Sequence, residues 1–253
     1  MQCGSCICNI LVVIGIASII KPVKVDKKAL NGLIPIEMIA IVLLLLLANI
    51  NSSGEYSVIN RWQGVLLIIF AVGYIIYTIY AENKAKNDEY DKEVIEEVKS
   101  KESTMSIWTT IVFIIVGILA LKYGSDFVVD NAVSIAEKIG LSEQFIGVTI
   151  VAIGTTLPEI ITGIVAARKD ASDLLIGNVI GSNILNLCLL SGIGSIISPL
   201  LYQTSFNASI VFLLVITMFL QLRIAKSNDN RIDRKNGILM LIVYVFYIIF
   251  MMK

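Results

Sequence analysis

Eight long runs of apolar residues constrain this chain more than any other feature of its sequence. Several extend for about 18 residues without a charge, which is the length that crosses a hydrocarbon core of about 30 Å. Hydrophobic residues make up 57% of the 253 positions, against about 45–50% in an ordinary soluble domain. The sequence therefore predicts an all-α polytopic membrane protein, with spans at residues 4–20, 36–50, 62–80, 107–138, 143–167, 174–198, 206–222 and 236–252.

Two of these runs need a separate interpretation. The run 107–138 is too long for a helix perpendicular to the bilayer, so it either tilts steeply or breaks near Gly124 and continues with Asp126 and Asp130. The stretch 7–20 has the length of a signal peptide. It lacks a basic n-region and an A-x-A cleavage site, so we interpret it as part of a span.

Basic residues alternate between connections and set the orientation of the spans, because Lys and Arg accumulate on the cytoplasmic side. The first, third, fifth and seventh connections hold 16 of the 20 Lys and Arg residues. These connections are predicted to be cytoplasmic, with both termini outside, in a protein of the cell (inner) membrane. The acidic third connection is interpreted as a linker between two halves, which divides the chain into 1–80, 81–106 and 107–253.

Composition excludes several function classes. The formal net charge is zero and histidine is absent. No basic patch is interleaved with aromatic residues, so nucleic acid is not an expected partner. Without imidazole the chain cannot form a Ser-His-Asp triad, an HExxH zinc site or a His-ligated haem. The C-x-x-C-x-C cluster of Cys3, Cys6 and Cys8 is consistent with a metal or redox site, but Cys in an apolar segment is more often a small buried side chain.

Two segments near the N-terminus recur later in the chain. GSCICNILVVIGIASIIKP (4–22) matches GSNILNLCLLSGIGSIISP (181–199) at ten of nineteen positions, with an offset of 177. RWQGVLLIIFAVGYIIY (61–77) matches RKNGILMLIVYVFYIIF (234–250) at eight of seventeen, with an offset of 173. Chance similarity between apolar helices is common, but two ordered matches at nearly one offset predict an internal repeat. The matched spans are predicted to run in opposite directions, and inverted repeats are typical of transporters, with the substrate site between them at the midplane.

The same alignment predicts that part of the first repeat is missing. The range 107–180 precedes the second copy of the Gly-Ser motif, whereas three residues precede the first copy at Gly4. Two spans are therefore expected to be absent, and we interpret the sequence as N-terminally truncated relative to a ten-span parent. If the missing helices exist as a separate chain, that chain is an expected partner.

The motif GTTLPEIITGI (154–164) places a proline and a carboxylate near the middle of the fifth run. Pro158 has no N–H, so the carbonyl four residues earlier loses its helical partner and the helix bends. Thr155 and Thr156 add hydroxyl oxygens, and Glu159 adds a carboxylate at a depth where an unpaired charge costs several kcal/mol. Such oxygens form the ligand set that hard cations such as Na⁺ and Ca²⁺ prefer. The alternative for Glu159 is a carboxyl that a neighbour keeps protonated.

Polar residues of the next run are predicted to face this motif. Ser182 and Asn186 are four residues apart and share a helix face, and Ser5 and Asn9 are their counterparts in the first repeat. A pseudo-twofold axis would bring all four to one centre. Taken singly, each is also consistent with the hydrogen bonds that Ser and Asn often make between membrane helices.

GVTIVAIGTTLPEIITGIVAARKDASDLLIGNVIGSNILNL (147–187) resembles the second α-repeat of the calcium/cation antiporter superfamily, the sodium/calcium exchangers, and GSCICNI (4–10) is similar to the end of the first. With the flanking spans, the likeness covers essentially the whole chain. The resemblance implies an inverted-repeat exchanger fold, here lacking the first two helices and so keeping about eight. It implies exchange of Ca²⁺ for Na⁺ or H⁺ by alternating access within the lipid bilayer, with no cofactor beyond the transported ions Ca²⁺ and Na⁺.

Carried onto matching positions, the resemblance implies ion ligands at Glu159, Thr155, Thr156, the Ala152 carbonyl, Ser182, Asn186, Ser5 and Asn9. Thr156 stands where Ser is usual, and Asn186 stands where many members have Asp. The family site uses two glutamates, whereas the acidic Pro-Glu segment of the first repeat is not in this sequence. Glu159 is then the one expected carboxylate, and we expect calcium affinity to collapse in the lone chain because one carboxylate cannot neutralise Ca²⁺.

Three function classes follow from these residues. The first is a secondary active cation transporter. The second is an inactive remnant or assembly partner without transport activity of its own. The third, an intramembrane enzyme, is disfavoured because a lone carboxylate without histidine or paired aspartates suits neither an acid nor a metal protease.

Overall fold

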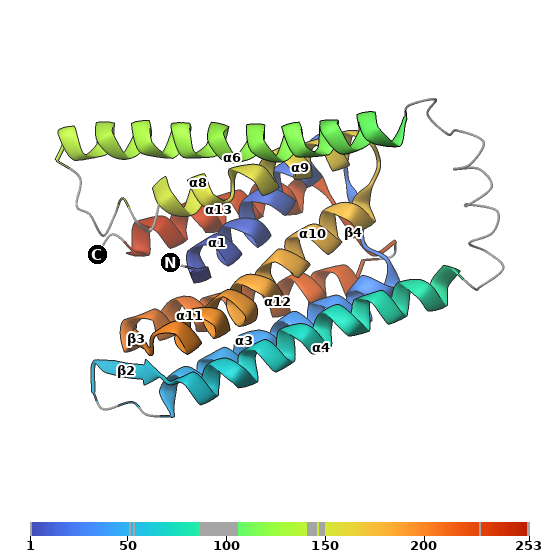
Figure 1. Cartoon of the computed structure of the whole chain (residues 1–253). Coiled ribbons are helices and arrows are strands. Elements are labelled where there is room, and N and C mark those ends of the chain that lie inside the picture. Colours follow the sequence, from blue (N-terminus) through green and yellow to red (C-terminus); the bar gives the residue numbers. More distant parts are fainter. Residues whose placement is uncertain are drawn as a thin grey trace.

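The computed structural model describes residues 2–50, 52, 54–86, 106–140, 146, 150–227 and 229–251, and these are mostly helical (Figure 1). The elements up to residue 86 are α1 (Gln2–Cys8), η1 (Asn9–Val13), α2 (Ile14–Ile20), β1 (Val23–Lys24), η2 (Ala29–Leu33), α3 (Ile34–Asn49), β2 (Tyr56–Ile59) and α4 (Arg61–Lys86). The later ones are α6 (Ile107–Lys138), α8 (Ala152–Thr155), α9 (Leu157–Arg168), α10 (Ser172–Ile184), η4 (Leu185–Leu190), α11 (Ser191–Ile197), β3 (Leu200–Gln203), η5 (Thr204–Phe206), α12 (Asn207–Ala225), β4 (Arg231–Ile232) and α13 (Arg234–Met251).

Six helical segments of the described chain are long and apolar enough to cross a membrane. They are Cys3–Ile20, Ala29–Asn49, Arg61–Asn83, Ile107–Lys138, Ser172–Ile197 and Thr204–Ala225. The other two spans expected from the sequence correspond to the broken pair α8 and α9 and to the 18-residue helix α13. Most of the predicted linker, residues 87–105, lies outside the described residues, and the division of the chain at this linker stays a prediction.

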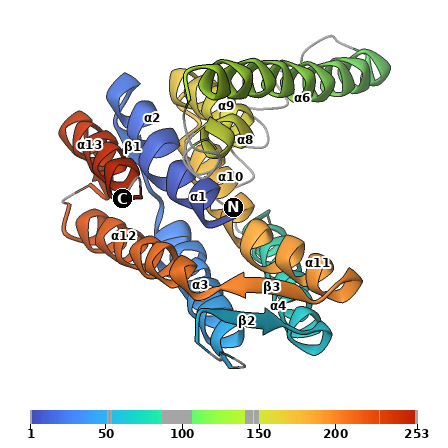
Figure 2. The ribbon, with the colours of Figure 1, turned by 90° about the vertical axis from the view of Figure 1, so that its left-hand side faces the viewer.

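The long helix α6 is unbroken at Gly124, so of the two alternatives predicted for this run the structure agrees with the tilt and not with the break. Its 32 residues correspond to about 48 Å of helix at 1.5 Å per residue, which exceeds the roughly 30 Å of a hydrocarbon core. A tilt or an overhang is therefore required. α6 packs against α8 and α9 and lies along one edge of the molecule, while α4 lies along the opposite edge (Figures 1 and 2).

The predicted inverted repeat is visible in the contacts between the two halves, because equivalent helices make equivalent contacts. α4 packs on α11, and α13, the counterpart of α4, packs on α2, the counterpart of α11. Each short strand of the first half also pairs in antiparallel fashion with one of the second: β1 pairs with β4, and β2 pairs with β3 (Figure 2). Each half therefore completes the other.

Glycines permit the two equivalent helix crossings. A Cβ on Gly64 of α4 would meet the Ser195 side chain and would lie 2.7 Å from the Gly192 carbonyl oxygen of α11. The equivalent glycine of α13, Gly237, approaches α2 in the same way, since a Cβ there would lie 2.6 Å from the Gly15 carbonyl oxygen. These close backbone approaches explain why Gly and Ser are shared between the two copies of the sequence repeat.

The pseudo-twofold axis passes between Cys6 and Asn183, which are equivalent positions at the offset of 177. Asn183 Nδ2 donates to the Cys6 carbonyl over 3.3 Å, and Cys6 Sγ donates to the Asn183 carbonyl over 3.9 Å. Two equivalent residues make such a reciprocal contact where the axis passes between them. Both are fully buried, so the axis runs through the core of the bundle.

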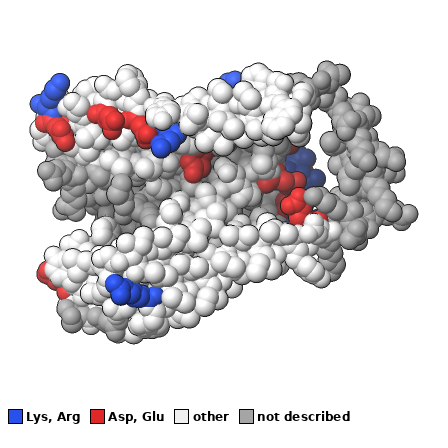
Figure 3. Space-filling view, in the orientation of Figure 1, with Lys and Arg blue, Asp and Glu red and all other residues white. Residues whose placement is uncertain are grey.

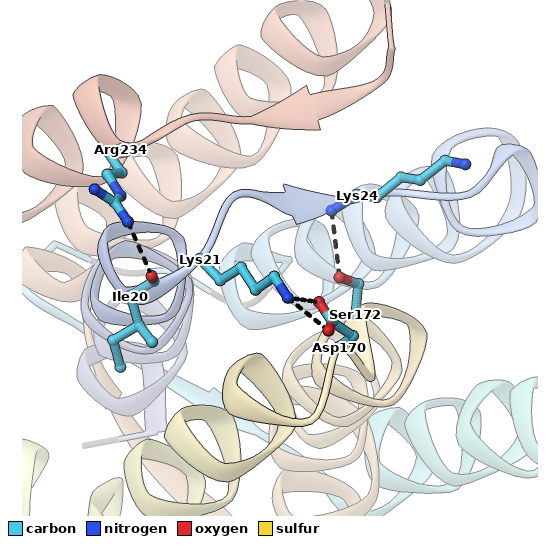
Figure 4. Close-up of polar contacts among 6 residues, drawn as sticks. All are labelled: Ile20, Lys21, Lys24, Asp170, Ser172 and Arg234. Atoms are coloured by element: carbon cyan, nitrogen blue, oxygen red, sulfur yellow. Dashed lines mark hydrogen bonds and ion pairs between the residues drawn. The ribbon is translucent and has the colours of Figure 1, made fainter.

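Three of the basic connections contact one another, as Figure 4 shows. Lys21 Nζ donates to the Asp170 carboxylate over 2.5 Å and joins the first connection to the fifth. The β1–β4 pairing joins the first connection to the seventh, where Arg234 donates to the Ile20 carbonyl over 3.5 Å. The second and sixth connections pair through β2 and β3. This grouping of odd and even connections agrees with the alternation of the basic residues.

Candidate functional site

The predicted break in the fifth span lies at Thr156, between α8 and α9. Pro158 stands in the first turn of α9, as expected for a residue without an N–H. The Thr156 N–H bonds to the Ile153 carbonyl at 3.0 Å and not to that of Ala152. The Ala152 carbonyl accepts the two threonine hydroxyls instead, from Thr155 at 3.1 Å and from Thr156 at 2.7 Å. Three of the predicted ligand residues therefore form one local cluster of oxygens.

Side chains of the first repeat reach this cluster and the next span directly. Ser5 Oγ lies 2.9 Å from Thr155 Oγ1, and Asn9 Nδ2 donates to Ser182 Oγ over 3.1 Å. These contacts join positions that are 150 and 173 residues apart in the sequence. The structure thus brings Ser5, Asn9, Thr155 and Ser182 together where α1, η1, α8 and α10 meet.

Glu159 lies in the first turn of α9, beside this cluster in the chain. It is half-buried, and its Oε2 atom is buried with no hydrogen-bond partner among the described residues. α9 packs against both η1 and α10. Figure 3 shows a hollow between the surfaces over α6 and α4, with acidic side chains inside it. A buried carboxylate oxygen that has no hydrogen-bond partner is available to a cation.

The last of the predicted ligands, Asn186, lies in the π-helical segment η4. It is half-buried in η4, and no hydrogen bond joins its side chain to another described residue. Both η1, which begins at Asn9, and η4 are π-helical. π-helical turns often mark functional sites in α-helices, and these two occur at equivalent places in the repeat.

A second buried carboxylate, Glu37, was missed by the sequence analysis. Glu37 of α3 is 0% exposed, and its Oε1 accepts from Asn183 Nδ2 over 2.6 Å. Asn183 Oδ1 in turn accepts from Asn9 Nδ2 over 3.0 Å. The expectation that Glu159 is the only carboxylate close to these residues is therefore wrong. A charged residue inside the second apolar run, two positions after Pro35, was the signal that could have identified it.

The cysteines are free thiols. Cys6, Cys8 and Cys188 are buried and Cys3 is half-buried. Among the described residues, no group of three or more His, Cys, Asp and Glu side chains could hold a metal ion. The burial of Cys6 and Cys8 agrees with the interpretation of these cysteines as small buried side chains.

Comparisons with known proteins place this architecture in one family. The sequence profile described as "Sodium/calcium exchanger protein" matches residues 2–80 and 109–253. A membrane protein of Methanocaldococcus jannaschii is 32% identical over 245 residues, covering 97% of this chain and 73% of its own. The sodium/calcium exchanger MaX1 of Methanosarcina acetivorans is 44% identical over 94 residues, which cover 37% of this chain and 27% of its own.

The fold matches a solved exchanger as well. The structure of the sodium/calcium exchanger from Methanococcus jannaschii superposes with a TM-score of 0.73 and 28% identity, covering 98% of this chain and 73% of that protein. This chain thus spans about three quarters of the length of the relatives that it matches along its whole length. With the family profile matching both halves and the all-helical exchanger fold matching throughout, the chain belongs to the sodium/calcium exchanger family.

Proposed function

We propose that this protein is a secondary active transporter that exchanges Ca²⁺ for Na⁺ at a site between its inverted repeats. One observation carries the proposal: hydroxyl and amide groups from both repeats meet in direct hydrogen-bond contact beside the broken helix that carries Glu159. Oxygen ligands of this kind suit both cations. The similar exchanger NCX_Mj has been solved after soaking with Na⁺ and Sr²⁺, which supports a divalent cation as the exchanged ion.

The proposed ligands are those expected from the sequence: Glu159, Thr155, Thr156, the Ala152 carbonyl, Ser182, Asn186, Ser5 and Asn9. Glu159 supplies the charge, and the neutral oxygens replace water around the ion. Asn9 and Thr155 are anchored across the repeat boundary. A relative movement of the halves would therefore alter the site, as alternating access requires. H⁺ in place of Na⁺ is the alternative coupling ion.

The test is transport by the full chain in sealed proteoliposomes. We expect the wild type to take up radioactive calcium when Na⁺ is loaded inside and absent outside. In Glu159→Gln this uptake should fall at least tenfold, because the variant keeps the shape of the side chain but removes its charge. The matched control is Glu55→Gln, which makes the same change on an exposed loop. A pH gradient applied in place of the sodium gradient distinguishes H⁺ coupling.

Two outcomes would count against the proposal. No gradient-driven uptake by the wild-type chain would favour a remnant or an assembly partner without transport of its own. Equal loss in Glu55→Gln and Glu159→Gln would show that the loss reflects the folding of the protein and not the site.

A further inference from the structure

Glu37 is a buried acid within a membrane span that the proposed ion site does not use. It is the ninth residue of the 21-residue segment Ala29–Asn49. Its side chain is 0% exposed, its Oε1 is bonded to Asn183, and its Oε2 has no hydrogen-bond partner among the described residues. An isolated carboxylate in such surroundings is strongly disfavoured unless a cation or a proton neutralises it.

No basic side chain of the described chain neutralises Glu37. The elements packed against α3 include α4, α10, α12, η2, β2 and η4. Their described charged side chains are exposed and lie near helix ends: Arg61, Glu82, Asp173 and Arg223. The titratable groups with an electrostatic interaction with Glu37 are the Cys6 thiol and the Tyr74 phenol, and the buried Cys188 thiol lies in η4, which packs against α3. All three groups are uncharged at neutral pH. A proton is therefore the available neutralising partner when no metal ion is bound.

A short hydrogen-bonded chain connects Glu37 to the proposed ion site. Asn183 bonds to the Glu37 carboxyl through its amide nitrogen and to Asn9 through its amide oxygen. Asn9, which is 1% exposed, also contacts Ser182, and its own Oδ1 is buried without a partner among the described residues. The hydrogen bond to Asn183 thus fixes the orientation of the Asn9 side-chain amide, including its oxygen. The hydrogen bond to Glu37 fixes the orientation of Asn183 in turn.

We propose that Glu37 is a proton-binding site linked to the cation site, protonated when that site is empty and ionised when a divalent cation occupies it. In this step the O–H bond of the carboxylic acid breaks, the proton leaves to the solvent, and the carboxylate remains. Glu37 and Glu159 together then balance the two charges of Ca²⁺. The linkage rests on the proposed function, because it requires a cation near Asn9 and Ser182.

The proton itself is tested without any metal, by infrared difference spectroscopy of the full chain in lipid at neutral pH. We expect a carboxylic-acid C=O band in the wild type that disappears in Glu37→Gln, shifts in Glu37→Asp and persists in Glu55→Gln. Glu37→Gln keeps the oxygen that accepts from Asn183, so it is the variant least prone to misfold. The absence of a Glu37-dependent band in folded protein would overturn the proposal.

The linkage is tested by adding Ca²⁺ to weakly buffered protein with a pH-sensitive dye, while radioactive calcium binding is measured in parallel. We expect the wild type to release about one more proton per bound ion than Glu37→Gln, with loss of the infrared band. Calcium binding without this difference would overturn the linkage. Failure of the wild type to bind calcium would overturn both the linkage and the proposed function, while the metal-free band would still report the proton on Glu37.

Discussion

Thr156 stabilises the helix break between α8 and α9, beside which the candidate site lies. At this residue the backbone N–H bonds to the Ile153 carbonyl, and the Ala152 carbonyl accepts the side-chain hydroxyls of Thr155 and Thr156. We expect Thr156→Val to lower the free energy of unfolding by about 1–3 kcal/mol, because a buried carbonyl loses its shortest donor. Chemical denaturation in detergent, followed by helical circular dichroism, measures this change.

Thr156→Ser is the matched control for that prediction. It keeps the hydroxyl and removes one methyl group, so its stability should lie closer to that of the wild type. If Thr156→Val and the wild type unfold at the same denaturant concentration, the hydroxyl does not support the break.

The residue scale also shows why Asn183 and Glu37 escaped the sequence analysis. Ser182 and Asn186 were grouped by the four-residue spacing of an α-helix. The π-helical segment η4 begins at Leu185, between them, and a π-helical turn does not keep the four-residue spacing of an α-helix. Asn183 contacts Asn9 beside Ser182 instead. The pairing of Glu37 with Asn183 could not be predicted, because the two residues lie 146 positions apart and no local pattern reports such a pairing.

At the element scale, the crossing of α4 with α11 depends on small residues where the two helices touch. We expect Gly64→Ala to destabilise the protein by about 1–3 kcal/mol, because its methyl group would meet Ser195 and the Gly192 carbonyl and backbone cannot yield as a flexible side chain does. Gly237→Ala should have a similar effect at the equivalent crossing of α13 with α2. Thermal unfolding followed by tryptophan fluorescence measures both.

Gly73→Ala provides the control on the same helix. A Cβ at Gly73 meets nothing within 4 Å, so this change should be neutral or slightly stabilising, in line with the better helix propensity of alanine. Equal destabilisation by Gly64→Ala and Gly73→Ala would contradict a packing role for Gly64.

Elements were easier to predict than their contacts. The apolar runs located the spans because length and lack of charge are local properties, and Pro158 located the break because its missing N–H acts within one turn. The repeat predicted which helices are equivalent. It could not predict that α4 packs on α11, because that choice depends on the close approach of glycines far apart in the sequence.

At the scale of the whole molecule, the grouping of connections makes the orientation testable. We expect a membrane-impermeant maleimide to label Glu55→Cys in intact cells and Lys27→Cys only after permeabilisation, because the basic first connection is predicted to be cytoplasmic. Both positions are exposed. Gel-shift labelling measures the two rates, and the wild type, with three buried cysteines and one half-buried, gives the background. Labelling of Lys27→Cys in intact cells would reverse the orientation.

The reciprocal contact of Cys6 with Asn183 has a consequence for how a proton on Glu37 would act. In alternating access, each inverted half takes up the conformation that the other had before. Atoms on the pseudo-twofold axis move least in such a change. The hydrogen bond from Asn183 to Glu37 should therefore persist whether the ion site opens to one aqueous phase or to the other. A lower pH would then reduce the affinity for calcium equally on both sides of the membrane. It would change the rate of exchange without favouring one direction of transport.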